Sequence, residues 1–314
     1  MNIQTRQIGR TDLNVTLLGI GGAPLGGNFT DVDRSDAIGV ISAGFEAGLN
    51  YIDTAPFYGF GRSERAVGDA IRGRDYVLST KVGRLLEPGA HPNPMDEGMI
   101  EPLPFHPVYD YTYDGVMRSF EASQHRLGLD RIDILPAHDI GAMQHGAELN
   151  AGYFSDLANG GYRAMDELRS NGQVRAIGLG VNENAVCMAA LDIGDWDTFL
   201  LAGRYTLLEQ TSLDDLIPAC QVAGTSLIIG GPFNSGILVG REMWNYSKAP
   251  ENVVNRVKKI GDICADNGVD LPVAALQFPL AHPVVSSIIP GARTAAESQS
   301  ILDWAATLLN VIEN

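Results

Sequence analysis

Short apolar runs alternate with longer amphipathic segments along the whole chain. The runs are rich in Val, Ile and Leu, and Gly, Pro, Asn and Asp separate them from the segments that follow. Runs that are apolar at nearly every position are typical of parallel strands covered by helices. The pattern predicts strands at Leu17–Gly21, Leu49–Asp53, Tyr76–Lys81, Ile132–Ala137, Val174–Gly180, Thr198–Leu201, Thr225–Ile229 and Val285–Ile289.

A helical pattern follows each predicted strand. The helices are expected to begin near Arg34, Ser63, Tyr113, Tyr162, Glu183, Leu213, Val253 and Ala295. Strands that each precede a helix describe an α/β fold, the (β/α)8 TIM barrel, with an open doubly wound sheet as the alternative. No linker divides residues 1–314, which predicts a single domain and favours the barrel. A β-hairpin of Gln4–Ile8 and Asn14–Thr16 is expected to cap its bottom.

One segment interrupts the alternation of strands and helices. Residues 84–114 are rich in proline and contain Phe105, Tyr109, Tyr111 and Tyr113. So many prolines argue against a helix, and we expect a long loop after the third strand. A loop in that position lies on the C-terminal face of a barrel, where active sites are found, and long loops in compact domains are usually functional.

Charge and cysteine content exclude several classes of function. Lys and Arg total 22 against 38 Asp and Glu, and the net charge of −16 repels nucleic acids and anionic membranes. No apolar segment reaches the ~20 residues of a membrane span, so we expect a soluble protein, and the cysteine pattern favours the reduced cytoplasm. The three cysteines form no CxxC pair and the six histidines no HxxxH pair, so neither disulfides nor a metal site are expected. The oligomeric state stays open.

Three charged or polar residues stand at the ends of consecutive predicted strands. Asp53, Lys81 and His138 would converge on one face of a barrel, and Tyr58 in the loop after the second strand can reach the same face. A tyrosine with a pKa of about 10 needs a nearby cation to exchange protons near neutrality. Lys81 can be that cation, Asp53 its carboxylate partner, and His138 a hydrogen-bond donor to a substrate oxygen.

Each of these residues also has an ordinary structural interpretation. A single Asp after a strand is usually a turn or helix cap, a single Lys a solvated charge, and a single His a structural residue. Tyr58 alone could be an aromatic residue on the rim of the barrel. The placement of Asp53, Lys81 and His138 at three successive strand ends is what favours a common site.

The motifs around these residues resemble the aldo-keto reductase family over nearly the whole chain. The matching segments are 48–59, Ser79-Thr80-Lys81, and Asp133 through Asp139. The resemblance implies a catalytic tetrad of Asp53, Tyr58, Lys81 and His138, a nicotinamide cofactor and a small-molecule substrate.

The resemblance also implies cofactor-binding residues. Segment 174–182 is similar to the fifth strand that holds the nicotinamide amide, so Asn182 is expected to bind it, although Val181 replaces the usual serine. The usual stacking aromatic is missing, and Phe233 is the candidate replacement. Pro290, Gly291 and Arg293 match the turn and helix start at the adenosine end. Because Gly291 replaces a basic residue that NADP-specific members often carry and the nearby Glu297 is acidic, NAD is preferred over NADP.

Further segments resemble one branch of the family. Residues 21–27, 207–210 and 230–236 are similar to L-fucose, D-threo-aldose and galactose 1-dehydrogenases and to pyridoxal 4-dehydrogenase. The resemblance implies oxidation of an aldose at its hemiacetal C1 to a lactone. The alternatives are oxidation of pyridoxal to its lactone, general aldehyde reduction with NADPH, and a nicotinamide-binding regulatory subunit without turnover. Phe105, Tyr109 and Tyr111 could form a stacking surface for pyridoxal or for the C–H face of a sugar, so they do not distinguish the two substrates.

Overall fold

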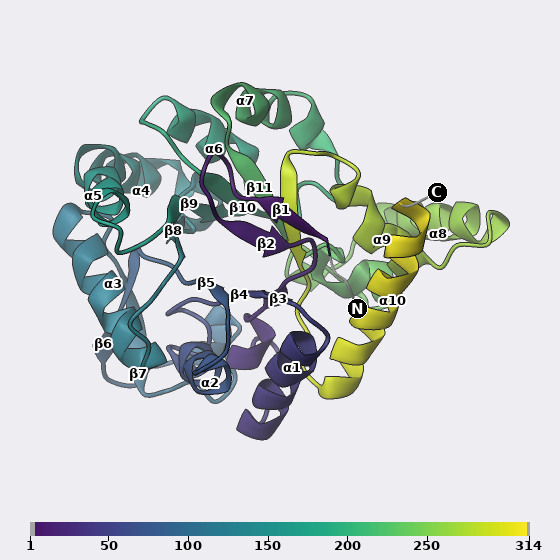
Figure 1. Cartoon of the computed structure of the whole chain (residues 1–314), viewed down its shortest axis with the longest axis horizontal. Coiled ribbons are helices and arrows are strands. Elements are labelled where there is room, and N and C mark those ends of the chain that lie inside the picture. The colour runs from purple at the N-terminus through teal and green to yellow at the C-terminus, as the bar shows by residue number, and fades with distance from the viewer. Residues whose placement is uncertain (1–3, 313–314) are drawn as a thin grey trace.

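Eight parallel strands form a closed barrel (Figure 1). The computed structural model describes the backbone of residues 4–312 and the side chains of residues 4–307. Parallel bridges from Leu18 to Ile288 and from Gly21 to Gly291 join the first strand to the last. The predicted (β/α)8 barrel is therefore confirmed. Its strands are β3 (Ile20–Gly21), β4 (Tyr51–Asp53), β5 (Val77–Ser79), β8 (Ile134–His138), β9 (Ala176–Val181), β10 (Thr198–Ala202), β11 (Ser226–Gly230) and β14 (Val285–Ile289).

Helices surround the barrel, and all eight predicted ones are present within three residues of the expected start. They are α1 (Arg34–Glu46), α2 (Arg62–Ile71), α3 (Tyr113–Leu127), α5 (Tyr162–Ser170), α6 (Asn184–Leu191), α7 (Leu216–Ala223), α8 (Glu251–Asp266) and α10 (Ala295–Ile312). The sequence pattern missed α4 (Ala142–Asp156), which buries no residue and is kinked at Gly146, where φ is 72°. It also missed α9 (Leu271–Leu280), which is apolar nearly all round and therefore shows no helical period.

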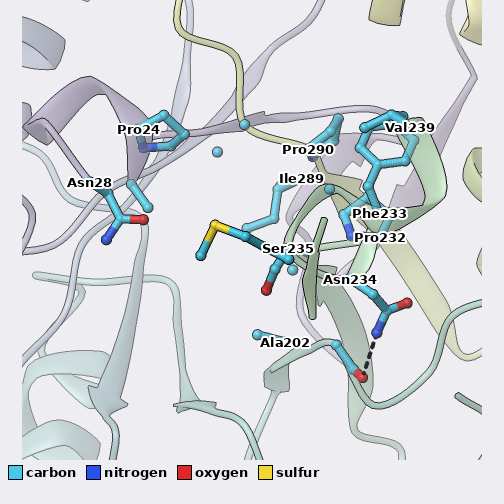
Figure 2. A pocket seen from close by; sticks show the side chains of 18 of the residues that line it. Pro24, Asn28, Ala202, Pro232, Phe233, Asn234, Ser235, Val239, Ile289 and Pro290 are labelled. Carbon is cyan, nitrogen blue, oxygen red and sulfur yellow. Dashed lines mark hydrogen bonds between the residues drawn. The ribbon is translucent and has the colours of Figure 1, made fainter. Parts of the chain in front are cut away.

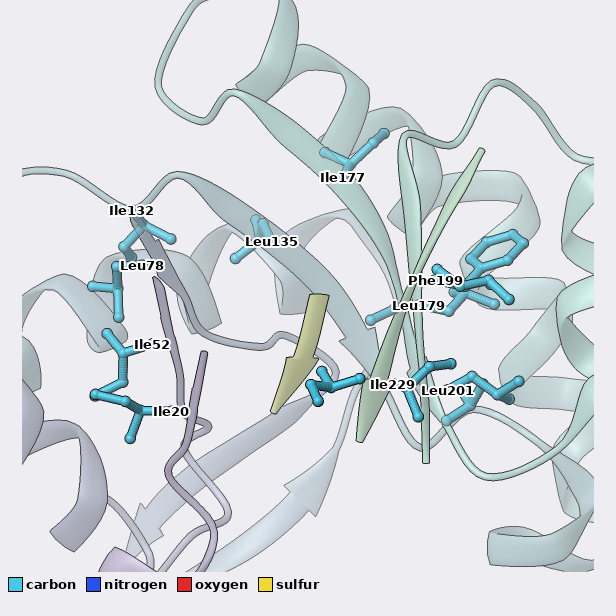
Figure 3. Close-up of a cluster of buried hydrophobic side chains, with 14 of the residues drawn as sticks. Ile20, Ile52, Leu78, Ile132, Leu135, Ile177, Leu179, Phe199, Leu201 and Ile229 are labelled. Carbon is cyan, nitrogen blue, oxygen red and sulfur yellow. The ribbon is translucent and has the colours of Figure 1, made fainter. Parts of the chain in front are cut away.

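The strands bury two layers of side chains. The side chains of Leu200 and Ile228 belong to an inner cluster, together with Ile8 and Leu13 of the N-terminal hairpin. That hairpin, β1 (Thr5–Gln7) and β2 (Asn14–Thr16), is antiparallel and lies across one end of the barrel, as predicted (Figure 1). The alternate strand residues face the helices in the outer cluster shown in Figure 3. One end of the barrel is thus filled, which leaves the C-terminal face for a site.

The segment after β5 differs from the prediction of a long loop. Strands β6 (Arg84–Pro88) and β7 (Phe105–Tyr109) pair antiparallel, with Arg84 opposite Tyr109, and a 3-10 helix, η2 (Pro94–Glu97), lies between them. A two-stranded ribbon has only edge strands, where proline is tolerated. Tyr111 after the ribbon is fully buried, so it cannot provide the expected stacking surface for a ligand.

A second short hairpin, β12 (Met243–Trp244) and β13 (Ser247–Lys248), follows β11 and the 3-10 helix η5 (Asn234–Val239). A further 3-10 helix, η1 (Pro24–Gly26), follows β3, and η4 (Thr211–Leu213) precedes α7. The segment η3 (Leu157–Gly161) joins α4 to α5. Across residues 4–312, none of the helices has both the length and the apolar character that crossing a membrane requires.

Candidate active site

The four residues of the expected tetrad meet at the C-terminal face of the barrel. Asp53 ends β4, His138 ends β8, Lys81 follows β5, and Tyr58 lies between β4 and α2. Lys81 Nζ lies 5.1 Å from the centre of the Tyr58 ring. The Tyr58 and His138 rings meet edge to face, with centroids 5.7 Å apart. The barrel therefore brings together residues that are as far as 85 positions apart in the chain.

Asp53 and Lys81 form a buried ion pair. Lys81 Nζ lies 2.8 and 2.6 Å from the two carboxylate oxygens of Asp53 and donates a further hydrogen bond of 2.8 Å to the carbonyl of Thr54. Ser79 Oγ donates to Asp53 Oδ1 at 2.5 Å. Burial raises the pKa of Asp53, and the charge of Lys81 opposes that rise. The partners on both sides hold the ammonium group in one place beside Tyr58.

The structure corrects the expectation that Lys81 lowers the pKa of Tyr58. Burial holds the Tyr58 pKa well above its ordinary value, and the charges of Asp53 and Asp139 and the neighbouring Tyr246 raise it further. Arg84 is the cation that opposes this rise. The physical reason is burial, which disfavours the charged phenolate, together with the nearby carboxylates. The phenol is therefore protonated at neutral pH.

His138 is held by its backbone and is neutral at neutral pH. Its amide donates to the carbonyl of Val82 at 2.8 Å, and its carbonyl accepts from the hydroxyl of Tyr111 at 2.7 Å. Burial, followed by the charges of Arg84 and Lys81, lowers its pKa well below 6.5. A neutral imidazole has one donor and one acceptor nitrogen, so its tautomer decides how it binds a substrate oxygen.

A cleft of about 390 Å³ is lined by Asp53 and Tyr58 at one end and by Glu297 of α10 at the other. Figure 2 shows part of its wall, with Pro24, Phe233 and Pro290. The cleft is lined by each of the predicted cofactor-binding residues, Asn182, Phe233, Pro290, Gly291 and Arg293.

Glycine lets the backbone approach closely along this cleft. A Cβ atom added at Gly291 would lie 2.5 Å from Pro24 Cγ, and one added at Gly21 would lie 2.7 Å from the carbonyl oxygen of Ile289. At the α10 end, Arg293 Nε is buried without a hydrogen-bond partner. A narrow glycine-walled channel with a half-buried arginine and a helix start fits a nicotinamide dinucleotide.

Two of the predicted cofactor residues have specific neighbours. The side-chain amide of Asn182 donates to the hydroxyl of Tyr246 at 3.0 Å. The ring of Phe233 packs edge to face against Trp304 of α10, with centroids 5.7 Å apart. Phe233 thus belongs to the wall that the cleft shares with α10.

The sequence analysis assigned no site role to Asn245 or Tyr246, and it used Glu297 only as an acidic residue that favours NAD. Tyr246 and Asn245 both have positive φ, at 62° and 46°, in the turn that joins β12 to β13. Glu297 accepts from Arg241 and from the amide of Arg293, each at 2.8 Å. These residues follow no strand end and are brought to the cleft by tertiary contacts. Among the described residues, no group of three or more His, Cys, Asp or Glu side chains could hold a metal ion.

Comparisons with known proteins agree with this architecture. Residues 17–311 match the model of the Aldo/keto reductase family. Pyridoxal 4-dehydrogenase of Microbacterium luteolum is 44% identical over 96% of this chain and 92% of its own. D-threo-aldose 1-dehydrogenase of a Pseudomonas species is 35% identical over 94% and 90%.

Solved structures show the same fold. The aldo-keto reductase AKR11C1 from Bacillus halodurans, in its holo form, superimposes with a TM-score of 0.77 at 24% identity. The superposition covers 97% of this chain and 91% of that one. Taken with the family match and the two relatives, the barrel and its cleft identify the chain as a member of the aldo/keto reductase family, an NAD(P)-dependent oxidoreductase.

Proposed function

We propose that the protein oxidises a cyclic hemiacetal to a lactone, with pyridoxal as the leading substrate and an aldose as the second. The buried Asp53–Lys81 pair beside Tyr58, at the end of the cleft, is the observation that carries the proposal. The sequence alone placed an aldose first. The relative that acts on pyridoxal is 44% identical and the aldose dehydrogenase 35% identical over similar lengths, which favours the opposite order.

The proposed reaction breaks one C–H and one O–H bond of the hemiacetal and forms the lactone carbonyl. When bound, the oxidised nicotinamide dinucleotide supplies the hydride acceptor. Tyr58 takes the hydroxyl proton at its phenolic oxygen, and His138 orients the substrate oxygen. Lys81, fixed by Asp53, stabilises negative charge on Tyr58 during the transfer. Asn182, Pro290, Gly291 and Arg293 are proposed to bind the dinucleotide, and Phe233 to support it from the α10 side.

The raised pKa of Tyr58 predicts how oxidation depends on pH. Oxidation needs the phenolate to accept a proton, and the fraction of phenolate rises with pH towards a pKa that lies well above its ordinary value. We therefore expect kcat for oxidation to increase from neutral to alkaline pH, and kcat for reduction to decrease. Initial rates in both directions across this range test the sign. An oxidation rate that falls as pH rises would contradict this role for Tyr58.

Parallel initial-rate measurements distinguish the substrates. Pyridoxal, L-fucose, D-arabinose and L-galactose are each oxidised with NAD and then with NADP under one set of conditions. The highest kcat/KM with pyridoxal supports the leading proposal. A preference for a sugar would leave the proposed reaction and residue roles unchanged and would change only the substrate. Absence of turnover with all four overturns hemiacetal oxidation and makes general aldehyde reduction the leading alternative.

Glu297 is expected to favour NAD over NADP. Its carboxylate lies between Arg241 and the start of α10, where it can accept a hydrogen bond from a ribose hydroxyl and repel a 2′-phosphate. Replacing Glu297 by glutamine removes this charge and leaves Arg241 and Arg293 free to attract the phosphate. We expect the preference for NAD, measured as the ratio of kcat/KM values, to fall about tenfold, which corresponds to 1.4 kcal/mol.

The matched control for Glu297 is Asp303→Asn, on the same helix, where the carboxylate pairs with Gln299 on the exposed side. This variant should keep the wild-type ratio. An unchanged ratio in Glu297→Gln would show that cofactor choice is made elsewhere in the cleft.

A further inference from the structure

The hairpin of β12 and β13 carries a tyrosine in a conformation that tyrosine rarely adopts. Trp244 pairs with Ser247 across this hairpin. Asn245 and Tyr246 between them form a two-residue turn, and both have positive φ, at 46° and 62°. The second position of such a turn is usually glycine, which reaches positive φ without a steric penalty. The Tyr246 ring is 51% exposed, so burial in the core does not offset the strain, and the turn alone gives no reason for tyrosine here.

The hydroxyl of Tyr246 is bound to Asn182, a residue that lines the cleft. The side-chain nitrogen of Asn182 donates to this hydroxyl at 3.0 Å and to the carbonyl of Ala202 at 3.5 Å. A carbonyl oxygen only accepts hydrogen bonds, which places the nitrogen of the amide on this side. Among the described residues, no group donates to Asn182 Oδ1. The contacts therefore occupy the donor end of the amide and leave its acceptor oxygen for a ligand.

Asn182 stands beside strand ends that offer no other polar side chain. It follows Val181, the last residue of β9, and it contacts Ala202, the last residue of β10, which Figure 2 shows at the cleft. The carboxamide of a nicotinamide ring has an N–H donor, and an amide oxygen is a suitable acceptor for it. Because the two strand ends are otherwise apolar, recognition of the carboxamide here depends on how the Asn182 amide is turned.

Arg204 ties the turn of the hairpin to the backbone of Asn182. Its Nε donates to the Asn182 carbonyl at 2.6 Å, and its Nη2 donates to Asn245 Oδ1 at 3.0 Å. The planar guanidinium holds these two contacts in a fixed relative geometry. On the other side, the amide of Tyr246 donates to Ser235 Oγ of η5 at 3.0 Å. The turn is thus fixed both to the end of β9 and to η5, and this fixes the place of the Tyr246 hydroxyl.

We propose that Tyr246 and Arg204 are positioning residues that hold the Asn182 amide for the carboxamide of the nicotinamide ring. The inference rests on the proposed function, in which Asn182 binds the dinucleotide. Tyr246 occupies the amide nitrogen, so Asn182 Oδ1 accepts from the carboxamide N–H. Arg204 acts through Asn245 and through the backbone of Asn182. This role for the hydroxyl explains why the strained turn contains tyrosine instead of glycine.

Three ligands separate the parts of the dinucleotide that are bound. NAD carries the carboxamide, its acetylpyridine analogue has a methyl group in place of the amino group, and ADP-ribose lacks the whole ring. Fluorescence titration of the full-length protein gives a Kd for each ligand without turnover. A change confined to NAD reports on the N–H contact, whereas a change for ADP-ribose reports on the rest of the cleft.

In Tyr246→Phe, we expect the Kd for NAD to rise about three- to tenfold, the usual contribution of one hydrogen bond. The Kd values for the acetylpyridine analogue and for ADP-ribose should not change. Tyr246→Gly removes the hydroxyl and relieves the turn, so it should weaken NAD in the same way while the melting temperature is kept or raised. Arg204→Met should also weaken NAD selectively, and Arg204→Lys less strongly because lysine lacks the fork.

Tyr113→Phe is the matched control. The hydroxyl of Tyr113 also donates to a side chain, Glu167, at 2.8 Å, but neither residue lines the cleft. Loss of this hydroxyl should leave all three Kd values unchanged.

A double-variant cycle with Asn182→Ala tests whether Tyr246 acts through Asn182. Asn182→Ala should itself weaken NAD, and adding Tyr246→Phe should then change nothing further. Additive losses would mean that the Tyr246 hydroxyl contacts the dinucleotide itself, and they overturn the proposal. An unchanged Kd for NAD in Tyr246→Phe, or equal weakening of all three ligands, overturns it too. Wild-type affinity for NAD in Asn182→Ala instead overturns the cofactor role given to Asn182 in the proposed function, and the inference falls with it.

Discussion

Replacing Tyr58 by phenylalanine is expected to lower kcat for oxidation by about 10²- to 10⁴-fold, the usual contribution of a positioned acid or base. The substitution removes the phenolic oxygen that exchanges the proton and keeps the ring that faces His138 and lies near Lys81. Because the ring is preserved, the cleft should keep its shape. Steady-state kinetics gives the loss in kcat, and a fluorescence titration with the dinucleotide should give an unchanged Kd.

Tyr76→Phe provides the matched control for this experiment. Tyr76 precedes β5, at the end of the strand away from the cleft, and its hydroxyl only reaches the carbonyl of Arg131 at 3.4 Å. The same loss of a hydroxyl should therefore leave kcat within about twofold of wild type. If Tyr58→Phe kept comparable activity, proton transfer would have to be assigned to another group.

The barrel architecture was predictable because the alternation of apolar runs with amphipathic segments is repeated along the whole chain. Strands such as β9 (Ala176–Val181) are continuous runs of apolar residues and glycine, and each strand is followed by a segment with a helical period. The prediction was wrong where this signal is absent or misleading. Helix α9 is apolar on all sides, and the proline content of residues 84–114 concealed a ribbon in which edge strands accept proline.

Part of the site was predictable for a related reason. Asp53 and His138 end their strands and Lys81 follows one, so strand order alone places them together. Asp139 directly follows the same strand as His138 and carries the same positional signal, which the sequence interpretation did not use. Arg84 gave no such signal, because its burial depends on Phe57 and Tyr109 folding over it.

Electrostatics was the least predictable property. The sequence suggested that Lys81 lowers the pKa of Tyr58, but burial of the ring and the nearby charges of Asp53 and Asp139 raise it instead. The sign of a pKa shift depends on distances between charges, and a sequence provides none of them.

Replacing Lys81 by methionine is expected to reduce both activity and stability. Lys81 and Asp53 are 1% and 2% exposed, so the substitution leaves a buried carboxylate without its cation. Breaking a buried pair in this way costs about 3–5 kcal/mol in the free energy of unfolding. Turnover should fall to nearly the level of Tyr58→Phe, because the ammonium group beside the phenol is then missing. Chemical denaturation and steady-state kinetics measure the two losses separately.

The double variant Lys81→Met/Asp53→Asn separates the catalytic role of this pair from its structural role. Neutralising Asp53 removes the unpaired buried charge, and asparagine can still accept the hydrogen bond from Ser79. Most of the lost stability should therefore return, since replacing both members of a buried pair is often nearly neutral. Activity should stay low because the ammonium group beside Tyr58 is still missing. Recovery of turnover together with stability would show that the pair only supports the fold, and Lys81 would then lose its proposed part in proton transfer.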